Sequence, residues 1–196
     1  MANLRFTNAL AAVAAENMVR GGAWLFLDLG RRVERAQAIA SEVGFALDEP
    51  PARIEGGLRL MLELCDSVIT YRSRYLTVLQ PAPALDLVLA DASNPRALAF
   101  QLEAISRNLS EVTTPDDTSL PDEAASLLAE AEAIVTELVE AADQAVAAAD
   151  LPPRLEAMAA RIAALSDGVT RRYFALLPAA QTLGLEGAEP ALRGAA

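Results

Sequence analysis

The chain has 196 residues, enough for one domain with a buried core, and it is 53% hydrophobic but only 5% aromatic. All sixteen basic residues are Arg, since His and Lys are absent, which excludes imidazole bases, His-ligated metals, Schiff bases and Lys-based phosphate loops within this chain. The net charge is −11, and residues 111–196 hold 5 Arg against 15 acidic residues, so nucleic acid and anionic membrane surfaces are not expected partners.

The abundance of Ala and Leu favours closely packed helices over strands, and Pro and Gly divide the chain into helical segments. Helices are predicted, in chain order, over residues 3–20, 23–47, 52–79, 95–110, 121–149 and 152–176, with a short helical turn over 84–90. Asn94 is expected to cap the helix that begins at Pro95. The fold class is therefore all-α, an antiparallel bundle of about five to six helices in one domain over residues 1–178, followed by a flexible tail over 179–196.

The apolar stretch near the N-terminus is short and mostly Ala, so it is interpreted as the first helix and not as a signal peptide. Nowhere does the sequence run for about 18 uninterrupted apolar residues, the length that a membrane-spanning helix needs. We therefore expect no membrane association and a cytoplasmic location.

The helix predicted over 23–47 carries an unusual concentration of charge beside its apolar stripe. At 100° per residue, Trp24, Asp28, Arg31 and Arg35 form one ridge, and Asp28 is within helical reach of Arg31 and Arg32. Because Asp28, Arg32 and Arg35 border the apolar stripe and do not oppose it, these charges are expected to be partly buried and paired.

The helix predicted over 52–79 has apolar residues on two nearly opposite sides, which is typical of a central helix in a bundle. Its single cysteine, Cys65, is interpreted as a buried small hydrophobe rather than a reactive thiol. Arg72 falls in the middle of one apolar face, and an unpaired charge there would cost several kcal/mol. An acid from another helix is therefore expected to meet it, with Asp28, Asp86 and Asp91 as the candidates.

The helix predicted over 121–149 is acidic, with Glu123, Glu130, Glu137 and Glu140 near a heptad spacing. A solvated helix face explains this spacing, and a surface for a basic partner is the alternative. Asp116 and Asp117 are interpreted as turn residues, and no acidic cluster has a spacing that predicts a metal site.

Several segments in one colinear order resemble the bacterial alpha-E domains, predicted helical domains named for a Glu-Arg motif, here Glu34-Arg35. The segments that carry the resemblance are Glu16-Asn-Met-Val-Arg20, Trp24 to Ala36, Asp66-Ser-Val-Ile-Thr-Tyr-Arg-Ser-Arg-Tyr75, Leu85-Asp-Leu-Val-Leu-Ala-Asp91 and Asn94-Pro-Arg to Leu102. They extend over about residues 5–176.

Full-length members usually begin with an earlier helical half that has its own signature, and this chain has no such segment before Met1. The resemblance therefore implies a half-length or truncated member with apolar faces built to meet another half. The expected partner is a chain that supplies the missing N-terminal half, or a second copy of this chain.

Members of the family are often fused to, or encoded beside, circularly permuted ATP-grasp proteins. The resemblance thus implies a non-catalytic helical accessory subunit of an ATP-grasp-type amide ligase system, with a circularly permuted ATP-grasp protein as a possible partner and no cofactor of its own. An enzymatic role for this chain is not favoured, because no catalytic motif is recognisable.

The alternative function is a binding or catalytic domain for a small carboxylate or phosphate, in which guanidinium groups clamp the anion and Asp28, Glu34 or Asp66 acts as a general base. A purely structural interpretation of the same charges is a buried ion-pair network that fixes the register of the helices. The residues assigned to this motif and charge network are Asp28, Arg31, Arg32, Glu34, Arg35, Asp66, Arg72, Arg74, Asp91, Asn94 and Arg96. No catalytic, cofactor-binding or metal-binding residue is assigned.

Overall fold

The computed structural model describes residues 16–75, 78–114 and 117–174, together with residues 6, 7, 9, 12 and 13. In this part of the chain every regular element is a helix, as the composition predicts. The tail expected over 179–196 and the end of the domain expected at residue 178 lie outside the described residues, as do residues 3–5, 8, 10, 11, 14 and 15 of the helix expected over 3–20.

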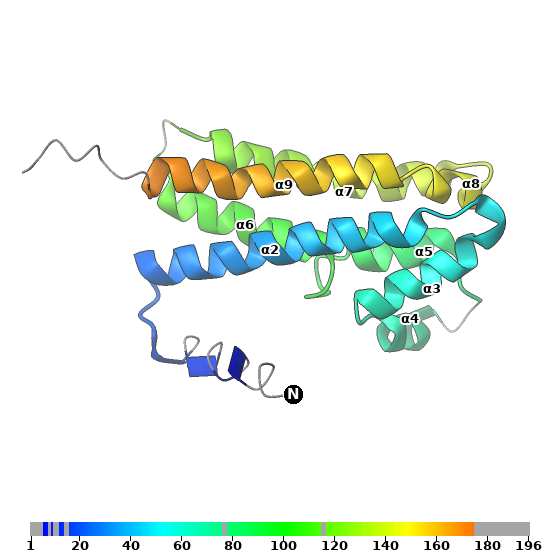
Figure 1. Ribbon diagram of the computed structural model, residues 1–196, viewed down its shortest axis with the longest axis horizontal. Helices are drawn as coiled ribbons and strands as arrows, with labels where there is room; N and C mark the ends of the chain where they lie inside the picture. Colours follow the sequence, from blue (N-terminus) through cyan, green and yellow to red (C-terminus); the bar gives the residue numbers. More distant parts are fainter. Residues whose placement is uncertain are drawn as a thin grey trace, which may run out of the picture.

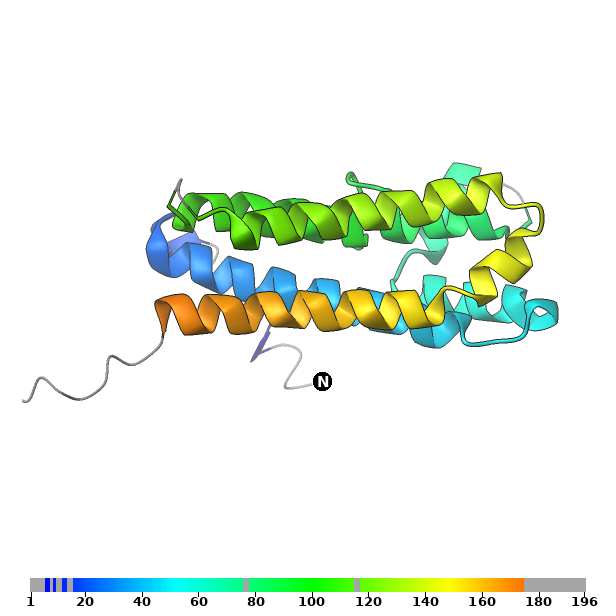
Figure 2. The same ribbon diagram turned by 90° about the horizontal axis from the view of Figure 1, so that it is seen from above.

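Four long helices form an antiparallel bundle (Figures 1 and 2): α2 (Gly22–Leu47), α6 (Leu98–Val112), α7 (Ser119–Glu140) and α9 (Pro152–Tyr173). α2 packs against both α6 and α9, and α7 packs against the same two helices from the other side. The shorter elements η1 (Pro51–Arg53), α3 (Ile54–Leu64), α4 (Val68–Tyr75), α5 (Pro81–Leu85) and η2 (Asp86–Ala90) lie between α2 and α6, and α8 (Gln144–Ala149) connects α7 to α9.

The central helix of the bundle is α2, and not the segment 52–79 as its two apolar sides predict. Leu29, Val33, Ala40 and Val43 of α2 are buried in the common core. In contrast, α3 and α4 project from one end of the bundle (Figure 1), and Ile69 of α4 is 82% exposed.

The continuous helix predicted over 52–79 is wrong, because the chain turns at Asp66, whose φ is +47°. The amide of Ser67 donates to the carbonyl of Leu62 and the amide of Asp66 to that of Glu63, which is the Schellman arrangement that ends a helix with a left-handed residue. Glycine usually takes this position, but Asp tolerates it better than most residues. The turn resets the helical phase, so residues after it face directions that one continuous helix does not predict.

Two other helix boundaries in the structure also differ from the predicted ones. The helix predicted over 121–149 is interrupted, because α7 ends at Glu140 and α8 begins after Asp143. The Asp143 carboxylate caps α8 by accepting hydrogen bonds from the amides of Ala145 and Val146. Asn94 caps only a local turn, by accepting from the amide of Arg96, and α6 begins at Leu98.

Three of the four acids of α7 face α9, which corrects both interpretations for them, whereas Glu140 is exposed, as a solvated helix face predicts. Glu123, Glu130 and Glu137 stand seven residues apart and pair with Arg154 and Arg161, which also stand seven residues apart on α9. Glu130 contacts both guanidinium groups, at 3.1 Å and 2.5 Å. The heptad spacing thus serves an antiparallel helix contact within the domain.

Candidate functional site

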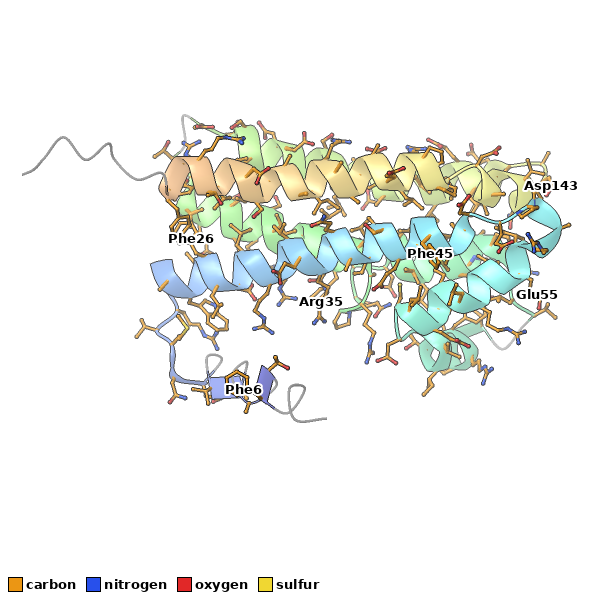
Figure 3. All side chains as sticks on the ribbon, in the orientation of Figure 1. Phe6, Phe26, Arg35, Phe45, Glu55 and Asp143 are labelled. Atoms are coloured by element: carbon orange, nitrogen blue, oxygen red, sulfur yellow. The ribbon has the colours of Figure 1, made fainter. Side chains whose placement is uncertain are left out.

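The charged ridge of α2 lies on the side of the helix that faces the end of α3, the turn at Asp66 and the loop before α6. Figure 3 shows Arg35 on this side of α2, away from α9. The ridge continues beyond Arg35 through Ala38 to Glu42, at steps of three and four residues that keep them on one face. The ridge therefore presents guanidinium and carboxylate groups from Asp28 to Glu42, along about four turns of one helix.

Part of the ridge is tied to α6. Arg32 pairs with Asp28 at 3.3 Å and also donates to the side-chain oxygen of Gln101 at 3.2 Å. Asn108 donates to Asp28 at 2.9 Å. Gln101 and Asn108 are buried, so the expected partly buried, paired charge is confirmed for Asp28 and Arg32.

The rest of the ridge opens into a groove of about 630 Å³ between α2 and the turn that joins α3 to α4. Leu64, Cys65 and Asp66 form the opposite wall together with Arg96 from the loop before α6, and Arg96 pairs with Asp66 at 2.6 Å. The groove is lined by Arg31, Glu34, Arg35, Ala38, Ile39, Glu42, Leu64, Cys65, Asp66 and Arg96. Residues from three separate segments of the sequence thus meet here.

Arg31 and Arg35 stand on this groove without an ion pair to any residue in the part of the chain that the structure describes. Both are exposed, so the expectation of burial and pairing is wrong for Arg35. The reason is that α6, which supplies Gln101 and Asn108, covers only the neighbouring edge of α2, where Asp28 and Arg32 lie. Two guanidinium groups four residues apart remain available to a ligand.

Glu42 and Cys65 lie at the other end of the groove. Burial raises the pKa of the half-buried Glu42 carboxyl. Burial, together with the charge of Glu42, raises the pKa of the Cys65 thiol to about 12. Cys65 is buried and uncharged at neutral pH, as expected for a small hydrophobe, and is a poor nucleophile.

Most of the remaining motif residues form a polar cluster that holds α4 and η2 together. Arg74 pairs with Asp91 at 2.5 Å, and the Tyr75 hydroxyl donates to Asp86 at 3.2 Å. Partial burial alone would raise the pKa of Asp91, but hydrogen bonds from Ser93 and Arg74 outweigh it and lower that pKa.

Asn94 is the buried centre of this cluster. Its amide donates to the carbonyl of Leu87 at 2.9 Å and lies 3.5 Å from the hydroxyl of Ser67, which is fully buried. Asn94 therefore joins η2 to the turn at Asp66, and its role is to maintain the local fold.

The structure thus separates the eleven predicted residues into groups. Arg31, Glu34, Arg35, Asp66 and Arg96 line the groove, Asp28 and Arg32 contact α6, and Arg74, Asp91 and Asn94 belong to the cluster around η2.

Arg72 joins none of these groups, because it is exposed, and the acid expected to meet it is not needed. Because the helical phase changes at Asp66, Arg74 and not Arg72 points toward Asp91 and pairs with it.

Sequence reasoning missed Glu42, Gln101 and Asn108. Glu42 follows Arg35 by seven residues, so extension of the ridge by two turns would have found it. Gln101 and Asn108 are also seven residues apart, a spacing that places both polar groups on one side of α6.

The sequence matches, over residues 3–174, the family described as Alpha-E, a predicted alpha-helical domain with a conserved ER motif. The chain belongs to the Alpha-E family. Its only Glu-Arg dipeptide is Glu34-Arg35, so in this Alpha-E domain the motif lies on the rim of the groove.

Curated proteins similar to this Alpha-E domain include uncharacterised proteins of Mycobacterium bovis and of two strains of Mycobacterium tuberculosis. Each is 31% identical over 115 residues, which are 58% of this chain and 13% of the relative. The matched region is thus a small part of much longer proteins. No solved structure matches the chain significantly.

Among the described residues, no helix has both the length and the apolar character needed to cross a bilayer. No group of three or more His, Cys, Asp and Glu side chains in the same residues is arranged to hold a metal ion.

Proposed function

We propose that this Alpha-E domain is a non-catalytic accessory subunit of a cytoplasmic ATP-grasp-type amide ligase system, which it joins by docking to a circularly permuted ATP-grasp protein. The observation that carries the proposal is a difference in length: the matched region is only 13% of each curated relative. A helical module that forms a small part of much longer proteins is expected to contact neighbouring domains, either in the same chain or in a separate one.

The surface that we assign to docking consists of Leu60 and Leu64 of α3, Ile69 of α4 and Val78 just after it. These side chains are between 38% and 82% exposed, on the helices that project from the bundle. Exposed apolar side chains that gather on one part of a soluble domain favour a protein contact. We call this set the α3–α4 apolar surface.

Copurification of this chain with a circularly permuted ATP-grasp protein encoded beside it, followed by an assay of ATP hydrolysis with and without the chain, tests the proposal. We expect a stable complex and a changed rate. Ile69→Glu should abolish coelution, because it places a charge in the contact. Val139→Glu is the matched control, since Val139 is 59% exposed but lies on α7.

A ligase that neither coelutes with the chain nor changes its ATPase rate would contradict the proposal. If light scattering instead shows a dimer of this chain that Ile69→Glu dissociates, the surface serves a second copy and the accessory role fails. Capture of a separate chain that supplies an N-terminal helical half would likewise replace the ligase as the occupant.

A further inference from the structure

The groove beside Glu34-Arg35, which we call the Glu-Arg groove, is lined by charged side chains of both signs. Arg31 and Arg35 lie at one end without an ion pair among the described residues, and Arg96 on the opposite wall is already neutralised by Asp66. Glu42 lies at the other end. Burial raises the pKa of its carboxyl, whereas a neighbouring cation would lower it. The groove therefore offers two guanidinium groups with Glu34 beside them at one end and the Glu42 carboxylate at the other, and none of these groups has an ion pair among the described residues.

The spacing between these groups sets the length of a ligand. Arg35 and Glu42 are seven residues apart on one helix, which is about 10 Å along the axis of α2. An extended tripeptide spans about the same length. A single free amino acid is too short to reach both ends together.

Apolar side chains line part of the groove between its two ends, beside the Asp66–Arg96 ion pair. Ala38 and Ile39 come from α2, and Leu64 and the buried Cys65 come from the end of α3. Because the Cys65 thiol stays neutral, it adds no charge to this wall. Small aliphatic side chains suit this part of the groove better than charged ones.

We propose that the Glu-Arg groove binds a short peptide with both ends free, its carboxylate at Arg35 and within reach of Arg31 one helical turn away, and its ammonium group at Glu42. Planar guanidinium groups favour the carboxylate through paired hydrogen bonds. A half-buried carboxylate favours the ammonium group, which supplies the cation that Glu42 lacks in the free domain. This inference concerns the isolated domain and does not depend on the proposed accessory role.

Calorimetric titration of the purified chain with trialanine tests the inference, with N-acetylated and C-amidated trialanine and inorganic phosphate as comparison probes. We expect trialanine to bind and each blocked peptide to bind about tenfold more weakly, because each loses one charged contact. Phosphate should bind more weakly than trialanine, since it engages only the arginine end.

Variants assign each end of the peptide. Glu42→Gln should weaken trialanine about tenfold and leave the affinity for the N-acetylated peptide unchanged, because that peptide has no ammonium group to lose. Arg31→Ala combined with Arg35→Ala should weaken both peptides. Arg59→Ala is the control, an exposed Arg of α3 outside the groove, and should change neither affinity.

The inference is overturned if trialanine does not bind at millimolar concentration, or if the blocked peptides bind as tightly as the free one. Phosphate that binds as tightly as trialanine would make the groove a plain anion site and would also overturn it. Circular dichroism of each variant establishes that a lost affinity does not come from a lost fold.

Discussion

The backbone of Gly57 in α3 lies directly against the carbonyl group of Ala46 in α2. A Cβ atom built on Gly57 would be 2.2 Å from the Ala46 oxygen, a distance that no relaxed structure tolerates. The contact belongs to the backbone of both helices, so no side-chain rotation relieves it. It fixes how α3 leaves the end of α2 and therefore where the far wall of the groove stands.

Gly57→Ala should destabilise the domain by about 1–3 kcal/mol, because α3 must move away from α2. Gly56→Ala is a control one residue away: nothing lies within 4 Å of its Cβ position, and Ala should stabilise the helix by about 0.5–1 kcal/mol. Urea denaturation measures both free energies of unfolding. Equal effects of the two substitutions would contradict the close approach of α2 and α3.

Glu130→Gln should lower the free energy of unfolding by about 1 kcal/mol, because Glu130 pairs with both Arg154 and Arg161 of α9. The value is modest, since these side chains remain between 23% and 37% exposed and solvent screens the pairs. In about 1 M NaCl the loss should shrink. Glu132→Gln changes an exposed acid on the same helix and should have little effect at either salt concentration.

The Cys65 thiol should react very slowly with a disulfide reagent in the native domain. A pKa raised from 9.0 to about 12 leaves about a thousandfold less thiolate at pH 8, and burial limits access further. We expect the rate in a native sample to follow that of unfolding, and the thiol to react at once in guanidinium chloride. Fast modification of folded protein would show that the groove wall is open at Cys65.

Asp91→Asn should cost about 1–2 kcal/mol at neutral pH, through lost hydrogen bonds from Arg74 and Ser93. The pKa of Asp91 is lowered on folding, so its carboxylate contributes stability above its unfolded pKa, near 4, and this contribution disappears as pH falls through the lower folded pKa. The difference between wild type and Asp91→Asn should therefore be constant from pH 6 to 8 and shrink in acid. A difference that persists at low pH would contradict the ion pair.

Hydrophobic periodicity and the Pro and Gly positions predicted the four long helices well, because these helices follow local rules. The predicted helix 23–47 agrees with α2 (Gly22–Leu47), and Pro152 does begin α9. The turn at Asp66 escaped prediction, since it depends on a non-Gly residue in the left-handed region that tertiary contacts support. The break before α8 had a local signal, the capping residue Asp143, but it lay within a continuous Ala-rich pattern.

The candidate site was only partly predictable for a related reason. Periodicity on one helix identified Arg31 and Arg35 as neighbours, but which charges α6 covers depends on how the helices pack. Arg32 and Arg35 look equivalent in the sequence, yet Arg32 contacts Gln101 and Arg35 has no such partner in the part of the chain described. The error for Arg72 followed directly from the missed turn at Asp66.

The central claim is that Arg31 and Arg35 bind a ligand, whereas Asn94 maintains the fold, although the sequence analysis assigned all three to one motif and charge network. The most direct measurement is the free energy of unfolding of two variants without ligand. The double substitution Arg31→Ala with Arg35→Ala should stay within about 0.5 kcal/mol of wild type, since both side chains are exposed and neither has an ion pair among the residues that the structure describes. Asn94→Ala should lose about 1–3 kcal/mol, because it leaves the buried Leu87 carbonyl without a donor. A double variant as unstable as Asn94→Ala would mean that the arginines stabilise the fold, and would contradict the account.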